Sequence, residues 1–222
     1  MLNKCIMSLR DIHCEREERV LFTALNAEFS RGSIVQIAGP NGAGKTTLMR
    51  ILTGLTGNFG GEIHWCDKPL RGLNFHGFLS SLLYFGHLPG IKSSLTAFEN
   101  LLWYFGLNGI KSAEGSTDDR IRERILSALA LVGLAGYEDI PCYQMSAGQQ
   151  RRVGLARLYC SKAPLWILDE PFIALDKNGV AAIESQLQQH AERGGVIVLS
   201  THQPLGIAGV QTLDLADFQE AN

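Results

Sequence analysis

The run GPNGAGKT, residues 39–46, constrains the fold of this chain more than any other stretch. It fits the pattern Gly, four residues, then Gly-Lys-Ser/Thr, and the apolar run IVQIA at residues 34–38 precedes it. In this pattern the glycines let backbone N–H groups turn toward phosphate oxygens, and the following helix adds the positive end of its dipole. The pattern needs a strand before it and a helix after it, so it predicts an α/β core.

The same loop predicts a nucleotide site. Lys45 is placed to meet the β- and γ-phosphates, and the Thr46 hydroxyl is placed to bind Mg²⁺. The alternative is a glycine-rich turn that binds nothing, and the strand and helix expected on either side argue against it. The predicted ATP-binding residues of the loop are Gly39, Pro40, Asn41, Gly42, Ala43, Gly44, Lys45, Thr46 and Thr47.

Two carboxylates and a histidine follow apolar runs typical of buried parallel strands. Asp169 and Glu170 end the run LWILDE, and His202 comes just after VIVLS. Ligands of parallel α/β sheets bind at the carboxyl ends of the strands. We therefore expect Asp169 to complete the Mg²⁺ site, Glu170 to act on the attacking water, and His202 to bond the γ-phosphate or that water. A solvated carboxylate pair and an ordinary surface histidine are the alternatives, and the phosphate loop disfavours them.

The stretch MSAGQQRR, residues 145–152, predicts a second anion site about a hundred residues downstream. Ser146 is a good helix cap, and Ala147, Gly148 and Gln149 would offer first-turn N–H groups. The alternative is simply a well-capped helix. The position of this stretch in front of the carboxylate run favours the anion site.

The rest of the chain predicts one domain in three parts. The fold class is an α/β P-loop NTPase core with a mixed, largely parallel sheet, an antiparallel N-terminal β subdomain and an inserted helical lobe. The core with its β subdomain is expected at about residues 1–78 and 147–222, and the lobe at about 79–146. Antiparallel strands are expected at 6–12, 20–29 and 62–65, buried strands at 34–38, 165–168 and 196–200, helices at 96–105, 118–132 and 179–193, and a surface turn at 111–117.

Composition narrows the setting. The 222 residues carry a formal net charge of -2, which gives no electrostatic footprint for nucleic acid. The five cysteines have no metal or C-x-x-C spacing, and no apolar run reaches the roughly 18 to 20 residues that span a bilayer. We expect a soluble, cytoplasmic chain whose membrane role, if it has one, comes through a partner.

The order of these motifs resembles that of ATP-binding-cassette (ABC) ATPases over essentially the whole chain. The family's signature, Leu-Ser-Gly-Gly-Gln, reads Met-Ser-Ala-Gly-Gln at residues 145–149. The resemblance implies ATP and Mg²⁺ as cofactors and a head-to-tail dimer with a second copy of the chain. In that dimer Ser146, Ala147, Gly148 and Gln149 would close over the ATP of the other subunit, and Asp176 would lie in the loop between the two sites.

Longer stretches are similar to one branch of the family, the ATP-binding subunits of bacterial haem exporters for cytochrome c maturation. They are YFGHLPGIKSSLTAFENLLWY, MSAGQQRRVGLARL and PLWILDEPFIALD. This similarity implies integral-membrane permease partners, docked near residues 87–99, and a peripheral location on the cytoplasmic face of the inner membrane. The apolar side chains expected to present the docking edge are Ile91, Leu95 and Phe98, and the alternative is that they face the core of the lobe itself. The alternatives are another ABC exporter, a soluble cassette acting on nucleic acid or ribosomes, and a binding module without turnover.

Two positions depart from the family pattern. The glutamine that usually links Mg²⁺ and water to the helical lobe is replaced, so that His87-Leu88 stands where the branch has His-Gln. His87 is expected to bond the water or metal shell in its place. The aromatic residue that usually stacks on adenine falls near Arg16, whose guanidinium can stack on a base face. Phe22 is the weaker candidate, because its sequence context is that of a core residue.

Overall fold

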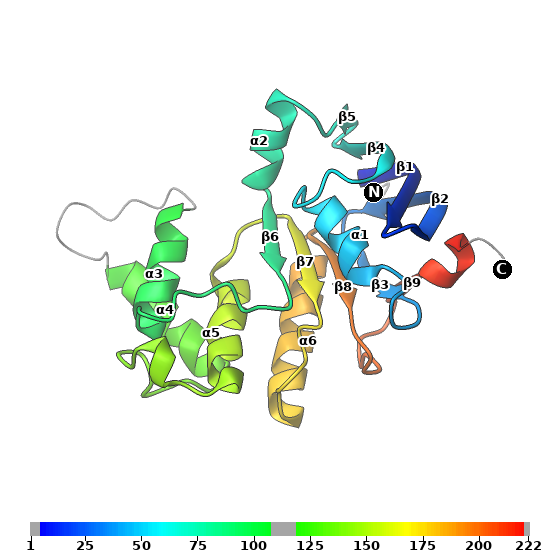
Figure 1. Ribbon diagram of the computed structural model, residues 1–222. Helices are drawn as coiled ribbons and strands as arrows, with labels where there is room; N and C mark the ends of the chain where they lie inside the picture. Colours follow the sequence, from blue (N-terminus) through cyan, green and yellow to red (C-terminus); the bar gives the residue numbers. More distant parts are fainter. Residues whose placement is uncertain (1–4, 108–118, 220–222) are drawn as a thin grey trace. The chain divides into compact units, whose positions relative to one another are not determined.

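The computed structural model describes residues 5–107 and 119–219. Two sheets form its framework (Figure 1). The larger sheet has the strand order β6-β7-β8-β3-β9, and the pairs β7–β8, β8–β3 and β3–β9 are parallel. Its strands are β3 (Ile34–Ala38), β6 (Leu82–Phe85), β7 (Leu165–Asp169), β8 (Val196–Ser200) and β9 (Gln211–Asp214).

The smaller sheet is antiparallel and has the order β2-β1-β4-β5. Strands β1 and β2 form a long hairpin whose register shifts at several points, which bends the pair. The four strands are β1 (Cys5–Arg16), β2 (Arg19–Ser30), β4 (Gly60–Trp65) and β5 (Lys68–Pro69). The prediction of an antiparallel N-terminal part and a parallel main sheet is confirmed.

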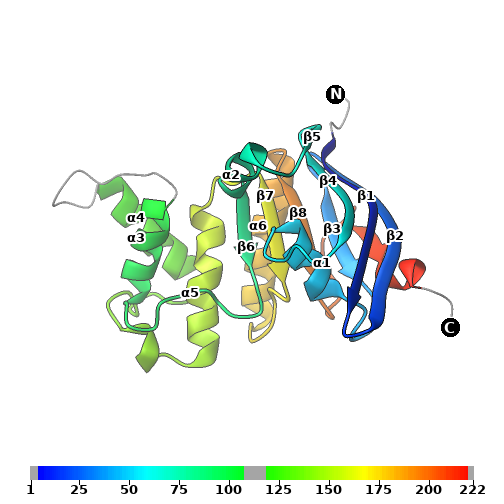
Figure 2. The same ribbon diagram turned by 45° about the horizontal axis from the view of Figure 1, so that its top comes forward.

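Six α-helices accompany the sheets in the described part of the chain, and Figure 2 shows them from a second direction. The predicted helices at 96–105, 118–132 and 179–193 are present with shifted ends. Neither the short helix α2 nor strand β9 was predicted, and the expected turn at 111–117 lies outside the described residues. The helices are α1 (Lys45–Leu52), α2 (Leu73–Leu79), α3 (Ala97–Leu107), α4 (Asp119–Leu131), α5 (Ala147–Cys160) and α6 (Lys177–Glu192), with 3₁₀ turns at Cys142–Gln144 and Leu215–Phe218.

The chain divides into two compact units. Unit 1 contains residues 1–84, 163–171 and 187–222, and unit 2 contains residues 85–162 and 172–186. Unit 1 holds both sheets apart from Phe85, the last residue of β6, and unit 2 holds helices α3, α4 and α5 and the first part of α6. This division differs from the predicted core at 1–78 and 147–222 with a lobe at 79–146, which stays a prediction.

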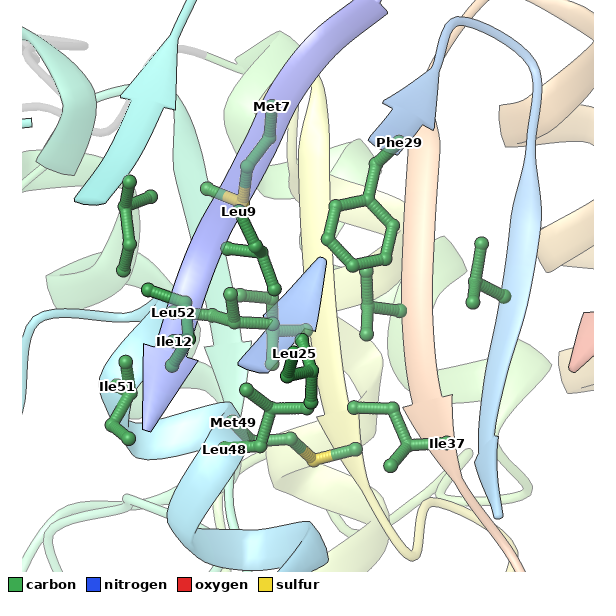
Figure 3. Close-up of a cluster of buried hydrophobic side chains, with 14 of the residues drawn as sticks. Met7, Leu9, Ile12, Leu25, Phe29, Ile37, Leu48, Met49, Ile51 and Leu52 are labelled. Atoms are coloured by element: carbon green, nitrogen blue, oxygen red, sulfur yellow. The ribbon is translucent and has the colours of Figure 1, made fainter. Parts of the chain in front are cut away.

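A hydrophobic core fills unit 1 between the antiparallel sheet and helix α1 (Figure 3). Met7, Leu9 and Ile12 of β1 meet Leu25 and Phe29 of β2, and all five are almost fully buried. Every residue of β7 and of β8 is also buried, as expected of parallel strands covered on both faces. This burial fixes the strand ends that carry the candidate site.

The ring of His190 lies inside unit 1 as a neutral group. It stacks on Trp166 with ring centroids 3.7 Å apart, and the absence of a side chain on Gly195 leaves room for it. Burial lowers the pKa of His190 from 6.5 to about 4, although a hydrogen bond to the Pro164 backbone opposes the shift and nearby Arg193 adds to it. The folded chain therefore accepts His190 only in its uncharged form near neutral pH.

We predict that His190→Gln reduces the acid sensitivity of folding. The folded pKa is lower than the unfolded one, so His190 contributes stability that is present above pH 6.5 and lost as the pH falls toward 4. Melting temperatures of wild type and His190→Gln should therefore converge, or cross, between pH 7.5 and pH 4.5. An unchanged difference across that range would contradict the assigned pKa shift.

Candidate nucleotide and magnesium site

Three glycines shape the loop between β3 and α1. Gly39, Gly42 and Gly44 have φ values of 134°, 81° and 97°, which L-residues with a side chain rarely adopt. A Cβ on Gly44 would lie 3.0 Å from the ring of Phe22, a fully buried residue of β2. The loop therefore needs glycine at position 44 for both backbone conformation and space. Phe22 is a core residue, as its sequence context indicated.

Lys45 holds its ammonium group across the loop. Its Nζ donates to the carbonyl oxygens of Gly39 at 2.7 Å and Pro40 at 3.1 Å. Both acceptors belong to the loop itself, so the positive charge stays above the residues whose N–H groups are predicted to hold phosphate. Helix α1 begins at Lys45 and directs the positive end of its dipole to the same place.

Thr46 and Asp169 come together although 123 residues separate them. The Thr46 hydroxyl donates to Oδ2 of Asp169 at 2.9 Å, and the Ser200 hydroxyl donates to Oδ1 at 2.8 Å. Asp169 ends β7 and is 3% exposed. A hydroxyl beside a carboxylate is a donor set that suits Mg²⁺, which prefers oxygen ligands and keeps several waters. The two residues assigned to the metal from sequence are thus adjacent.

Glu170 follows Asp169 and turns away from the strand with φ 52°. Its backbone N–H donates to the carbonyl oxygen of Ser200 at 3.2 Å and to the Ser200 hydroxyl at 3.1 Å. His202 Nε2 lies 3.5 Å from Oε1 of Glu170. The carboxylate is thereby held at the sheet edge beside Asp169, with the imidazole next to it.

Ser200 is the residue of this cluster that sequence reasoning missed. It ends β8, and its hydroxyl joins Asp169 to the Glu170 backbone. The available signal was the polar last residue of the apolar run VIVLS. Tyr84 is close enough to this cluster for the charge of Asp169 to act on it. Burial and, to a smaller extent, that charge raise the pKa of the Tyr84 phenol, whereas Arg50 lowers it.

Arg16 lies on the same face of unit 1 as the start of α1. It lines a cavity of about 210 Å³ together with Thr47 and Arg50. The guanidinium is largely exposed and has the carboxylate of Glu17 at 3.7 Å. A base held in this cavity would meet Arg16. Arg16 is the residue on which the adenine was predicted to stack.

Ser146 caps helix α5 in unit 2. Its hydroxyl accepts from the Gln149 N–H at 3.2 Å, and the Gln149 side chain accepts from the Ser146 N–H at 2.9 Å. The predicted cap is confirmed, and it uses one first-turn N–H within the helix. Asp176 similarly accepts from the Gly179 N–H at 2.7 Å in the first turn of α6.

Two arginines of α5 hold the segment that contains His87. Arg151 donates to the His87 carbonyl at 2.7 Å, and Arg157 donates to the Pro89 carbonyl at 2.7 Å. Gly154 lies between them, and a Cβ there would come 2.7 Å from the Pro89 carbonyl oxygen. The His87 side chain itself is exposed. Contacts to backbone carbonyls therefore fix this segment to α5. Such contacts do not depend on which side chain stands at position 87 or 88.

The predicted site residues fall into two groups. Unit 1 contains the residues of the phosphate loop together with Arg16, Asp169, Glu170 and His202. Unit 2 contains His87, Asp176 and the Ser146–Gln149 stretch. Unit 1 alone brings the loop lysine, the hydroxyl–carboxylate pair and the second carboxylate to one sheet edge. This constellation can bind a nucleotide and act on a water beside it.

Comparison with known proteins decides the family. The family model described as ABC transporter matches residues 22–173. The chain belongs to the ABC transporter family. It is an ATP-binding and ATP-hydrolysing member, and the phosphate loop and the carboxylates described above lie within the matched range.

Curated relatives and solved structures agree with this assignment. A Saccharophagus degradans protein named cytochrome c biogenesis ATP-binding export protein CcmA is 54% identical over 95% of this chain and 93% of its own. The Escherichia coli K12 protein of the same name is 49% identical over 91% and 92%.

The fold is shared with more distant cassettes. The dimeric cassette MJ0796 bound to ADP and phosphate has a TM-score of 0.76 at 23% identity, covering 89% of this chain and 88% of that one. A putative ABC transporter ATP-binding protein from Pyrococcus furiosus has a TM-score of 0.78 at 20% identity, covering 96% and 98%. Both support the P-loop NTPase fold class. Among the described residues, no helix is long and apolar enough to cross a membrane.

We predict that Gly44→Ala lowers the melting temperature and abolishes ATP binding. Left-handed backbone at an alanine and the approach to Phe22 together should cost about 2 kcal/mol or more, which is a loss of about 4–8 °C for a chain of this size. Gly57→Ala is the matched control, because a Cβ there meets nothing within 4 Å. Differential scanning fluorimetry with and without ATP would measure both effects. Equal behaviour of the two variants would contradict this account of the loop.

Proposed function

We propose that this chain is the ATP-hydrolysing subunit of a membrane exporter that serves cytochrome c maturation by haem export or handling. The observation that carries the proposal is the 49–54% identity, over more than nine tenths of both chains, to proteins named for cytochrome c biogenesis export. The chain also has the complete set of phosphate-loop and carboxylate residues, which supports ATP turnover and not binding alone.

The proposed chemistry divides among residues of unit 1. Residues 39–47 would bind the ATP phosphates, with Lys45 neutralising charge that develops on the transferred group. Thr46 and Asp169 would hold Mg²⁺, which would neutralise negative charge on the phosphates. Glu170 would accept a proton from the attacking water, and His202, 3.5 Å from Oε1, would orient that carboxylate and bond the γ-phosphate.

The residues of unit 2 receive their role from a dimer. Cassettes of this fold dimerise, as MJ0796 does. In the proposed head-to-tail pair, Ser146, Ala147, Gly148 and Gln149 of one copy bind the ATP held by the loop of the other. The cap at Ser146 supports this, since it fixes the first turn of α5 with its remaining N–H groups at the helix end. Asp176 and His87 would lie between the two sites and beside the water, respectively.

An integral-membrane permease is the proposed partner. The predicted edge at residues 87–99 contains Leu88, which is 78% exposed, and Trp103 on the nearby helix α3 is 43% exposed. Ile91, Leu95 and Phe98 are half-buried, so they would contribute part of their surface. We therefore place the chain on the cytoplasmic face of the inner membrane, bound through unit 2. The net charge of -2 disfavours the nucleic-acid alternative.

The proposal predicts that this chain restores cytochrome c maturation in a bacterium deprived of its own exporter ATPase. Glu170→Gln should restore none, although it keeps ATP binding, because it lacks the base. Lys45→Ala should fail and also bind ATP weakly. Purified Glu170→Gln should lose on the order of a hundredfold or more in turnover. Haem staining of c-type cytochromes and a phosphate-release assay are the measurements.

Matched expression of all three proteins in the membrane fraction is the control. Full maturation with Glu170→Gln would remove the assigned base. Wild-type ATPase activity without any restoration of cytochromes would leave an ABC ATPase that serves a different exporter.

A further inference from the structure

The tip of the β1–β2 hairpin carries two arginines opposite each other. Glu17 and Glu18 form a two-residue turn with φ values of 52° and 63°, and Arg16 pairs with Arg19 across it. Residues directly opposite in an antiparallel pair have side chains on one face, with Cβ atoms about 5 Å apart. Like charges in that arrangement destabilise the pair.

The turn itself does not require this pair. Strands β4 and β5 are joined by a turn with the same signs of φ, at Cys66 and Asp67, and Trp65 and Lys68 close it. The backbone geometry of the β1–β2 turn therefore does not impose two arginines at the positions that flank it.

Arg19 lies against the phosphate loop. Its Nη1 is 3.6 Å from the position a Cβ of Gly42 would occupy, so the guanidinium packs over the loop backbone where glycine leaves space. Helix α1 and the hairpin are neighbours in both views (Figures 1 and 2). Within the described residues, Arg19 has no carboxylate within 4.0 Å, whereas Arg16 has that of Glu17 at 3.7 Å.

We propose that Arg19 is a nucleotide-binding residue whose guanidinium donates to the phosphate chain of the nucleotide held by residues 39–47. The inference rests on the proposed ATP site and adds a contact outside its motifs. An exposed guanidinium without a partner offers a fork of N–H donors that matches phosphate oxygens.

The contact has a consequence for selectivity. A donor that reads phosphate oxygens adds the same affinity to any nucleoside triphosphate, whatever its base. The hairpin tip, residues 15–20, contains no aromatic ring that would favour a base by stacking. The hairpin tip is therefore expected to bind the phosphate chain of the nucleotide through Arg19. Arg16 instead lines the cavity that Thr47 also lines.

The test compares Arg19→Met with Arg31→Met, an exposed arginine in the turn between β2 and β3. The purified full-length proteins would displace a fluorescent ATP analogue with ATP, GTP or inorganic tripolyphosphate, a phosphate chain without a base. Arg19→Met should weaken all three ligands by the same factor, about 5- to 20-fold for a charge-assisted bond at an exposed position. Arg19→Lys should fall between wild type and Arg19→Met, and Arg31→Met should match wild type.

A second readout separates binding from a structural role. Without ligand, Arg19→Met should melt at the wild-type temperature or above it, because the substitution removes one of the two like charges that face each other across the turn. Its stabilisation by ATP should nevertheless be smaller than that of wild type. A lower melting temperature without ligand, together with unchanged relative stabilisation by ATP, would make Arg19 a structural residue and overturn the inference.

The remaining outcomes are distinguishable. Equal affinities in Arg19→Met and Arg31→Met would overturn the inference and leave the ATP site intact. Weaker ATP binding with unchanged tripolyphosphate binding would place the contact on the base or ribose and also overturn it. Failure of the wild-type protein to bind ATP at all would overturn the proposed function itself.

Discussion

The hydrogen bond between the Thr46 hydroxyl and the Asp169 carboxylate is the contact on which the candidate site depends. It spans 2.9 Å and joins the phosphate loop to the end of β7, two segments 123 residues apart. Ser200 holds the other carboxylate oxygen at 2.8 Å, so three elements of unit 1 meet at one buried side chain. Because β7 and β8 are buried along their whole length, the core fixes this meeting point.

Each neighbouring group of the site follows from that contact. Glu170 is the next residue, and its left-handed backbone turns it out of the strand while Ser200 holds its N–H. Lys45 precedes Thr46 in α1 and folds back over the carbonyls of Gly39 and Pro40. The loop lysine, the proposed metal ligands and the proposed base are therefore positioned by one strand pair and the start of one helix.

The sequence predicted the parts of this site that have a local cause. The loop lies between a strand and a helix because glycines and an apolar run specify both, and Ser146 caps α5 because Gln149 is three residues further on. Strand β9 was missed because Gln211–Asp214 is a short, half-exposed edge strand without an apolar run. Helix α2 was missed because it is only seven residues long and contains Gly77, a residue that disfavours helix.

Several contacts between segments far apart in the sequence were not predicted, for a different reason. Nothing local to Ser200 marks it as a partner of Asp169, and nothing local to Arg19 places its guanidinium over Gly42. The proposed roles of Ser146 and Asp176 depend on a second copy of the chain, and they were predicted only from the resemblance to ABC ATPases. No local pattern marks Arg151 and Arg157 as donors to the carbonyls of His87 and Pro89.

The most direct test of the central claim measures metal binding at Thr46 and Asp169. Mn²⁺ would be titrated into the protein saturated with a non-hydrolysable ATP analogue, and free Mn²⁺ would be measured by electron paramagnetic resonance. Wild type, Asp169→Asn and the control Glu170→Gln would be compared. The account predicts that Asp169→Asn weakens Mn²⁺ binding by about tenfold or more while Glu170→Gln leaves it unchanged. Equal Mn²⁺ affinity in wild type and Asp169→Asn would contradict it.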